Sequence, residues 1–469
     1  MGPGMVVARP RGRGGWLGTG VGVGGKARGS SSSSSSLGAL WWVGALAVGA
    51  GVHWGWASGV SPAGAAHPGG RRVGAGSPPA GRYARRLAEV ETACNAMEDP
   101  ALHYTRPVPR EEVEARVGFY LGPCWAECAR DGGACPPEAE VRAVLEELGA
   151  AVDEPRFDRI QRFAPRDPRW APPGGLGALW PTFLTDKMVL YGRDLAELIA
   201  GAGGGAADVP YYVKFGDALG GTGHAFPFLA KARRTGAHAG GNEGSCRNPV
   251  LLKMLRFRHY HGLTAGGPGR PFAERRDAAV WRGSTTGPRE AYVGGAGAGA
   301  GEGAREAPTH PRASLVTRMD EWELSGIVDV GVVRYVQGVP QRWGWKWPLM
   351  GRWLAAYKMV IQVEGNDVAS GLKWALLSGS AVVMPLPKVD SWAMESTLVP
   401  WVHYIPVEDD FSDLVERTVW CIDHPATCET IARQGACHMA KFLDEDADED
   451  VVHEVIARMA KVLAKYDAL

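Results

Sequence analysis

The sequence lacks several features that would point directly to a common class of protein. It has no excess of either charge, because Lys and Arg together number 51 and Asp and Glu together also number 51. The broad positive field of a nucleic-acid-binding protein is therefore missing, and we expect no nucleic-acid partner. GxxxxGKS/T does not occur, which excludes the P-loop, and the GxGxxG match at residues 20–25 lies in the Gly-rich basic tail rather than between a strand and a helix, so the usual dinucleotide fingerprint is not indicated.

Zinc-ligand spacing is also missing. The chain has 8 cysteines, with Cys246 between an early and a late group. The early group is Cys94, Cys124, Cys128 and Cys135, and the late group is Cys421, Cys428 and Cys437. Cys124 and Cys128 are close in sequence, but no second close pair with His accompanies them. We therefore predict structural disulfides within the early group.

No acidic residue occurs before Glu89, and such an acid-free start is typical of a targeting segment. A basic, Ser-rich tail precedes residues 37–60, which are uncharged when His53 is neutral and long enough to span a bilayer. The positive flank predicts a single-pass anchor with the body in the lumen of the Golgi or endoplasmic reticulum. A Ser-rich, Arg-containing, acid-free start also fits a chloroplast transit peptide, which is the alternative.

Apolar runs separated by a helical pattern indicate an α/β fold with a buried parallel sheet. Met359–Val363 and Ala381–Met384 are β-branched runs, and Ser370–Leu377 between them has helical spacing. An earlier strand, Tyr211–Phe215, stops at Gly216. Asp217, which follows, is expected at the carboxyl edge of a sheet, where such folds bind ligands.

Polar residues follow the strand that ends at Val363. Asp367 or Ser370 can cap the next helix, and its free N–H groups together with Lys373 suit a diphosphate. The alternative is an ordinary strand-to-helix turn. In WRGSTTG (residues 281–287), Arg282 beside Gly and hydroxyl groups predicts a phosphate clamp, with a structural ion pair as the alternative.

An acidic run, Asp444 to Asp450, contains Asp-x-Asp patterns that hold a metal in some sugar transferases. Here the run precedes an amphipathic pattern in residues 451–463. Negative charge at that position stabilises the start of a helix. We therefore interpret the run as a helix start.

Five segments resemble blocks of glycosyltransferase family 90, which includes fungal capsule-associated proteins, animal protein O-glucosyltransferases and bacterial lipopolysaccharide glycosyltransferases. They extend from about Tyr211 to Phe442 and read YYVKFGD, NPVLLKMLRFRH, WRGSTTG, KMVIQVEGNDVASGLKWALLSGSAVVMP and LVPWVHYIPVEDDFSDL. The resemblance implies a GT-B architecture of two facing Rossmann-like domains. It further implies an inverting transfer from UDP-glucose or UDP-xylose without a catalytic metal or other cofactor.

The resemblance also implies roles for individual residues. Asp217 matches the catalytic Asp and would take the proton of the acceptor hydroxyl. The predicted donor-binding residues, which would neutralise the leaving diphosphate, are Arg282, Gly283, Ser284, Thr285, Gly365, Asn366, Asp367, Ser370 and Lys373. The partners would be a UDP-sugar and a glycan or protein hydroxyl, with the membrane contacted through residues 37–60.

The predicted organisation combines these features. The expected parts are a basic tail at 1–36, a signal anchor at 37–60, a flexible stem at 61–82, an N-terminal acceptor-side domain at 83–277, a C-terminal nucleotide-sugar-binding domain at 278–440 with a low-complexity insertion at 289–313, and a closing helix at 441–469. Two alternatives to a lumenal transferase are a plastid enzyme acting on glycolipid or polysaccharide, and a catalytically silent relative that binds nucleotide sugars or glycans. Retention of both Asp217 and Arg282 argues against the silent relative.

Overall fold

The computed structural model describes most of the chain beyond residue 79. The described residues are 80–97, 107–149, 159–167, 170, 187–217, 224–235, 245–254, 270–287, 310–337, 339, 341, 346 and 351–466. They belong to one compact unit formed by residues 70–469. The predicted tail, anchor and stem lie outside the described residues, except that residues 80–82 begin helix α2 (Ala80–Asn95). Among the residues described, no helix has both the length and the apolar character needed to cross a membrane.

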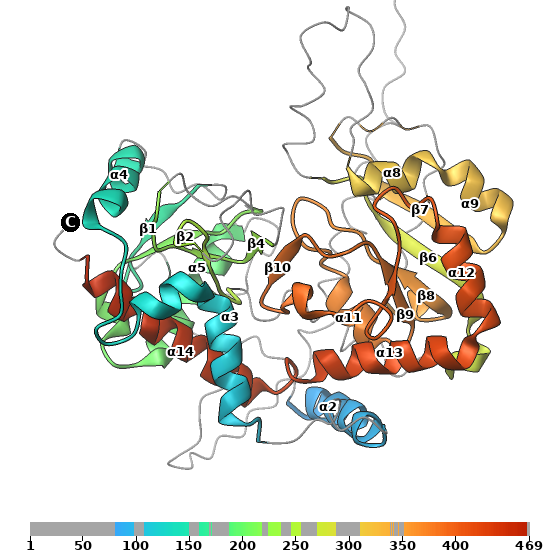
Figure 1. Cartoon of the computed structure of the whole chain (residues 1–469), viewed down its shortest axis with the longest axis horizontal. Coiled ribbons are helices and arrows are strands. Elements are labelled where there is room, and N and C mark those ends of the chain that lie inside the picture. Colours follow the sequence, from blue (N-terminus) through green and yellow to red (C-terminus); the bar gives the residue numbers. More distant parts are fainter. Residues whose placement is uncertain are drawn as a thin grey trace, which may run out of the picture. The chain divides into compact units, whose positions relative to one another are not determined.

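The N-terminal lobe contains a mixed sheet in the order β1-β2-β3-β5 (Figure 1). Its strands are β1 (Gln161–Phe163), β2 (Tyr211–Lys214), β3 (Leu229–Ala230) and β5 (Val250–Leu251). Strand β1 is antiparallel to β2, whereas β2, β3 and β5 are parallel. The helices of this lobe are α3 (Arg110–Cys128), α4 (Glu138–Gly149), α5 (Lys187–Ala202), the 3-10 turn η4 (Ala206–Asp208) and the C-terminal α14 (Glu445–Ala464).

Aromatic side chains fill the core of this lobe and fix the position of β2. Tyr211 and Val213 of β2 are buried. The ring of Phe215, directly after the strand, contacts those of Phe163, Trp170 and Tyr191 with centroids 6.0 to 6.5 Å apart. Burial of these large rings stabilises the end of β2. As a result, the chain leaves the sheet at a defined point, two residues before Asp217.

The C-terminal lobe contains a parallel five-stranded sheet in the order β11-β9-β8-β6-β7. Its strands are β6 (Arg276–Ser284), β7 (Val328–Arg334), β8 (Tyr357–Ile361), β9 (Ala381–Met384) and β11 (Ile405–Pro406). The helical elements are η6 (Phe272–Glu274), α8 (Pro311–Thr317), α9 (Met319–Ser325), α10 (Gly351–Leu354), α11 (Leu372–Leu377), η7 (Glu395–Thr397), α12 (Leu414–Asp423) and α13 (Pro425–Ala440). The α/β fold class predicted from the apolar runs is confirmed.

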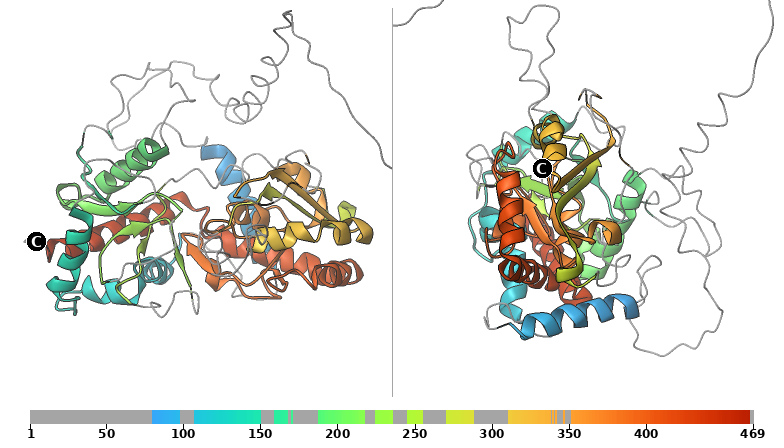
Figure 2. Two further views of the ribbon diagram at one scale, coloured as in Figure 1. Left: turned by 90° about the horizontal axis from the view of Figure 1, so that it is seen from above. Right: turned by 90° about the vertical axis from the view of Figure 1, so that its right-hand side faces the viewer.

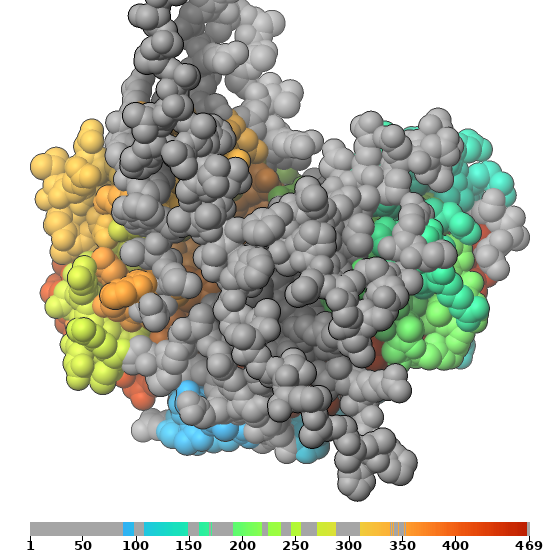
Figure 3. Space-filling view, turned by 180° about the vertical axis from the view of Figure 1, so that it is seen from behind, coloured from blue at the N-terminus to red at the C-terminus, as the bar shows by residue number. Residues whose placement is uncertain are grey.

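Helices cover both faces of the parallel sheet, and for this reason its central strands have no polar face. Val360 and Val382 pack in the same cluster as Leu372 and Leu376 of α11. Their neighbours in β8 and β9 pack with α8, α9 and α12 on the other face. Figure 2 shows these helical layers from two further directions, and Figure 3 shows α8 and α9 (amber) at the molecular surface. Two-sided burial explains the continuous apolar runs seen in the sequence.

A short two-stranded sheet joins the two lobes. Strand β4 (Ala232–Arg234) follows β3 of the N-terminal lobe, and β10 (Val389–Ser391) follows β9 of the C-terminal lobe. They pair antiparallel, with Ala232 opposite Ser391. Backbone hydrogen bonds therefore fix how the two sheets' carboxyl ends approach one another.

The C-terminal helix α14 returns to the N-terminal lobe and packs against α3 and α5. Asp444 caps it by accepting a hydrogen bond from the Ala447 N–H, so the acidic run does begin a helix. Within that helix the buried Asp448 carboxylate bonds to Arg116 at 2.6 Å and to Lys253 at 2.5 Å. A buried carboxylate needs such partners, since an unpaired charge there would be strongly destabilising.

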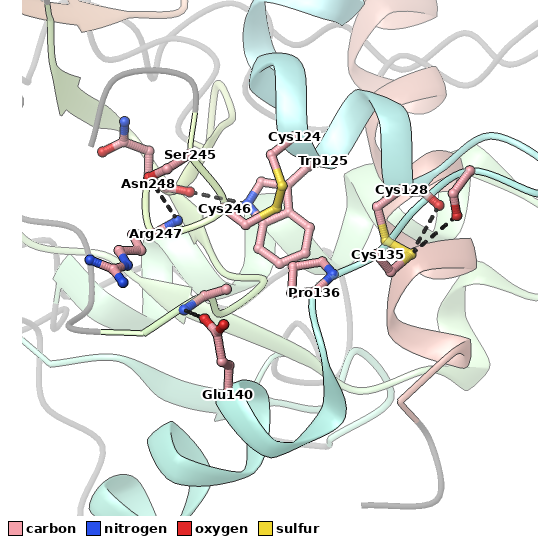
Figure 4. Close-up of a disulfide and its surroundings, with 12 residues drawn as sticks. Cys124, Trp125, Cys128, Cys135, Pro136, Glu140, Ser245, Cys246, Arg247 and Asn248 are labelled. Carbon is pink, nitrogen blue, oxygen red and sulfur yellow. Dashed lines mark hydrogen bonds between the residues drawn. A yellow bond between two sulfur atoms is a disulfide. The ribbon is translucent and has the colours of Figure 1, made fainter. Parts of the chain in front are cut away.

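All eight cysteines form disulfides, which confirms the prediction of structural bridges. The bonds are Cys94–Cys437, Cys124–Cys246, Cys128–Cys135 and Cys421–Cys428. Of the early group, Cys128 and Cys135 pair with each other, whereas Cys94 and Cys124 pair with cysteines outside the group. In Figure 4, Cys124 on α3 reaches Cys246 before β5, and the Trp125 indole beside it donates to the Asn248 carbonyl.

Candidate functional site

The predicted catalytic residue, Asp217, lies where the two lobes meet. Its Oδ1 is bonded to the Lys231 ammonium, and its Oδ2 accepts a hydrogen bond of 3.1 Å from Asn366 Nδ2. Lys231 follows β3, which is parallel to β2, whereas Asn366 belongs to the loop after β8 in the other lobe. The Asp217 side chain is 38% exposed, and it is therefore accessible to a ligand.

Asp367 completes what we call the interlobe cluster, which comprises Asp217, Lys231, Asn366 and Asp367. Its Oδ2 lies 2.9 Å from Lys231 Nζ, so one ammonium serves a carboxylate from each lobe. Burial raises the pKa of Asp367 above its ordinary value. Burial alone would lower the pKa of Lys231, but the charges of Asp367 and Asp217 outweigh it and the pKa is raised. The cluster thus holds a lysine that stays charged.

The amide of Asn366 is oriented by a second contact. Its Oδ1 accepts a hydrogen bond from Gln337, which also binds the backbone of Gly287 after β6. The Nδ2 group is consequently directed at Asp217. Loops from three strands of the C-terminal lobe thereby converge on the predicted base.

Arg282 makes an ion pair within the C-terminal sheet. Its guanidinium donates to both carboxylate oxygens of Asp329 on β7, at 2.9 and 2.8 Å. Asp329 also accepts from Lys346 and Tyr357. Burial opposes ionisation of Asp329, but the hydrogen bonds from Arg282 and Lys346 outweigh it and lower its pKa to about 2. Of the two interpretations left open by the sequence, the structure shows the ion pair.

The residues that follow Arg282 have mainly packing roles. A Cβ on Gly283 would lie 2.5 Å from the Trp281 ring, so only glycine fits there. The buried Thr285 hydroxyl donates to the Val336 carbonyl and accepts from the Val336 N–H. Ser284 is half-buried, and its carbonyl accepts from Arg312.

Arg312 is a cation at this edge that the sequence analysis missed. Its guanidinium donates to Thr286 Oγ1 at 2.6 Å and to the carbonyls of Ser284 and Val363. A Cβ on Gly365 would lie 2.9 Å from this guanidinium, which explains the glycine. Arg312 lies in α8, and the end of the predicted low-complexity insertion (289–313) is therefore helical; residues 289–309 lie outside the described part. No local pattern in the sequence signals this contact.

The predicted helix after β8 is present but shorter than expected. Helix α11 has 6 residues, begins after Gly371 and receives no side-chain cap. Neither Asp367 nor the exposed Ser370 caps it, contrary to the prediction, because Asp367 is engaged with Lys231. The helix start therefore lacks the side-chain cap that was predicted for the phosphate-binding terminus.

Lys373 is buried beneath the interlobe cluster. Its side chain is 1% exposed, and its ammonium is bonded to the equally buried Glu395. Glu395 also accepts hydrogen bonds from the backbone N–H and hydroxyl of Ser391 on β10. The structure therefore brings Asp217, Asn366 and Asp367 together, but directs Arg282 and Lys373 toward other carboxylates.

A hollow that is open to solvent lies at the carboxyl ends of β8 and β9. Its apolar wall includes Val368, Leu372 and Met384, and its polar groups include Gln362 and Glu364. Glu364 accepts hydrogen bonds from the N–H groups of Lys388 and Val389. Burial raises the pKa of Glu364 to about 7. An apolar hollow with a few convergent polar groups is the kind of site that binds small molecules.

The Glu364 carboxyl should make stability depend on pH. Because its folded pKa is about 7 and its ordinary pKa is 4.5, the folded state binds the extra proton between these values and loses stability as pH rises through this window. Glu364→Gln keeps the acceptor oxygen, so we expect it to raise the free energy of unfolding at pH 8, by up to about 3 kcal/mol, and to change it little at pH 4. Thermal unfolding at both pH values checks this; an equal effect at both would contradict it.

Comparison with known proteins gives the family of the segment that follows β7. Residues 349–468 match the family model described as glycosyl transferase family 90. This segment contains Asn366, Asp367 and the residues that line the hollow beside Glu364, apart from Pro311. Asp217 and Lys231 lie outside it.

Curated relatives extend the similarity. The chain is 28% identical over 196 residues to O-glucosyltransferase LpsA of Dichelobacter nodosus, covering 42% of this chain and 52% of that protein. It is 33% identical over 106 residues to Protein O-glucosyltransferase 2 of Danio rerio, covering 23% of this chain and 21% of that protein. Uncharacterized protein 027R of Frog virus 3 is 41% identical over 93 residues, 19% of this chain and 10% of its own length. The matches thus span about half of the bacterial relative and less of the others.

Proposed function

We propose that the whole protein is an inverting glycosyltransferase, because residues 349–468 match the model of glycosyl transferase family 90. In this proposal it moves glucose or xylose from a UDP-sugar to a hydroxyl of a glycan or protein. The two lobes form a GT-B arrangement, with the acceptor on the N-terminal side. No metal or other cofactor takes part.

One observation carries the proposal. An accessible carboxylate, Asp217, leaves a strand of one lobe and meets Asn366 and Asp367, which leave a strand of the family segment in the other lobe. Ligands of open α/β folds bind outside the carboxyl ends of parallel strands, where both groups lie. An acid and a donor-side loop in contact are what direct displacement at a sugar carbon requires.

The proposed chemistry follows from the proximity of Asp217 to the loop that contains Asn366 and Asp367. Asp217 takes the acceptor's hydroxyl proton while that oxygen attacks the anomeric carbon. The new carbon–oxygen bond forms as the bond to the diphosphate breaks, and UDP leaves. Among the predicted donor residues, Gly365 and Ser284 contact the cation Arg312, which supports adding Arg312 to the phosphate-binding group. The hollow beside Glu364 is proposed to take the nucleoside.

The proposed location is the lumen of the Golgi or endoplasmic reticulum, with residues 37–60 as the membrane anchor. Its support is the oxidation state of the cysteines, because all eight are disulfide-bonded. Disulfides persist in oxidising compartments and are rare in the cytosol.

The proposal is tested by supplying the full-length protein with UDP-glucose, UDP-xylose and UDP-galactose, together with a glycoprotein and cell-wall extract. We expect UDP release with one of the first two sugars, and a product heavier by that sugar in mass analysis. We also expect EDTA to leave the rate unchanged. Absence of transfer from every donor would contradict the proposal, and a strict requirement for Mn²⁺ would contradict its metal-free chemistry.

A further inference from the structure

Lys231 has a position that its role as a simple ion-pair partner does not explain. Its side chain is 12% exposed and contacts two carboxylates, Asp217 from its own lobe and Asp367 from the other. A lysine with one buried acid partner is already compensated. With the second carboxylate, Lys231, Asp217 and Asp367 together carry a net negative charge. Burial of an uncompensated charge is unfavourable, so the second carboxylate calls for a functional reason.

The backbone on either side holds Lys231 firmly in place. It lies between β3 and β4, directly after Ala230, which is paired with Lys214 of β2. The next residue, Ala232, is paired with Ser391 of β10 in the C-terminal lobe. Lys231 therefore lies where the chain passes from pairing within its own sheet to pairing with the other lobe.

The charged and titratable groups around the cluster come from several elements. Tyr191 on α5 acts on Lys231, and Lys373 on α11 acts on Asp367. Asn366, which donates to the second oxygen of Asp217, is neutral. Asp217 and Asp367 are thus the two acids that share Lys231 directly.

We propose that Lys231 is a positioning residue of the transfer reaction, which keeps Asp217 ionised and oriented before proton transfer and is retained by Asp367 after it. This inference rests on the proposed function. Before reaction, the ammonium fixes Oδ1 of Asp217 and leaves a lone pair of Oδ2 for the acceptor hydroxyl.

The charges then balance throughout the step. As the acceptor oxygen bonds to the anomeric carbon and UDP departs, the hydroxyl proton passes to Asp217 and makes it neutral. Lys231 does not lose its last carboxyl partner at that moment, because Asp367 Oδ2 lies 2.9 Å from its ammonium. If Asp217 were the only acid beside Lys231, the same proton transfer would leave the buried ammonium without a counter-charge. The activation barrier of sugar transfer would then be higher.

Substitutions of Lys231 and of Asp367 should shift the pH dependence of kcat/KM in opposite directions. Lys231→Met removes a positive charge beside Asp217, so the acid limb of the kcat/KM profile should move up by about one pH unit or more. Asp367→Asn removes a like charge, so that limb should move down by a similar amount. Lys231→Arg keeps the charge and should restore the wild-type profile.

The experiment measures kcat/KM against pH for the full-length wild type and the three variants, with melting curves for each. Lys358→Met is the matched control, since Lys358 is 9% exposed and paired with Asp277 at the opposite ends of the strands; its profile should coincide with the wild type. Profiles of folded Lys231→Met and Asp367→Asn that coincide with the wild type, or that move together, would overturn the inference.

Two further outcomes separate the inference from the function on which it rests. If Lys231→Met fails to fold, the other two variants decide. The inference is overturned if the pH profile of Asp367→Asn stays at the wild-type position, or if the profile of Lys231→Arg moves away from it. If the wild type transfers no sugar from any donor, the proposed function is overturned and the inference with it. An active wild type with unresponsive variants overturns the inference alone.

Discussion

Replacing Asp217 by Asn should lower kcat/KM for sugar transfer by about 10²- to 10⁴-fold, the usual contribution of a general base. The amide keeps the size of the carboxylate but cannot take the acceptor's proton. Asp367 still contacts Lys231 in this variant, so the lysine is not left without a partner. We therefore expect the affinity for UDP to change by no more than about twofold, since the base acts on the acceptor rather than the leaving group.

The measurement combines initial rates of UDP release with a thermal-shift titration of UDP. Asp208→Asn is a suitable control, because Asp208 lies in η4 of the same lobe, is 56% exposed and pairs with Arg166. It should leave both quantities unchanged. Turnover of Asp217→Asn at the wild-type rate would exclude Asp217 as the base. If Asp217→Asn lost both turnover and UDP binding, Asp217 would instead be assigned to donor recognition.

The second large effect concerns stability. Lys373→Met should lower the free energy of unfolding by about 3–5 kcal/mol, because it leaves the buried Glu395 carboxylate without its cation. The ammonium also lies 5.7 Å from the ring centroid of Trp392, so the substitution removes that contact as well. For a protein of this size the melting temperature should fall by on the order of 10 °C.

A double variant separates the charge from the packing. Lys373→Met with Glu395→Gln leaves no unpaired charge, so most of the lost stability should return. Lys358→Met is the comparison, since its partner Asp277 is 58% exposed and the expected loss is below about 1 kcal/mol. A melting temperature of the single Lys373 variant equal to that of the wild type would show that the pair contributes nothing.

The sequence predicted those parts of the fold that have a local cause. The run at 381–384 forms β9 and the run at 359–363 overlaps β8, because burial on both faces makes the central strands mostly apolar. The strand before Asp217 was found for a related reason, since buried Tyr211 and Val213 alternate with half-buried residues. Strands β3 and β5, at 2 residues each, are too short for any periodicity, and they were not foreseen.

The candidate site was predictable only in part, since its geometry depends on long-range contacts. Asn366 and Asp217 are 149 residues apart, and nothing local to either reveals their hydrogen bond. The same limit applies to Arg282, whose partner Asp329 lies 47 residues away on the neighbouring strand. Lys231 and Arg312 were overlooked because one follows a two-residue strand and the other closes a Gly-rich tract.

The bond between Cys94 and Cys437 constrains how the chain is made. Its two cysteines are 343 residues apart in the sequence, so it can form only after Cys437 has been synthesised. Until then Cys94 is accompanied by Cys124, Cys128 and Cys135, which emerge soon after it and are available as wrong partners. Maturation should consequently require thiol exchange, a process of seconds to hours, and production in a host that lacks a disulfide isomerase should yield scrambled molecules.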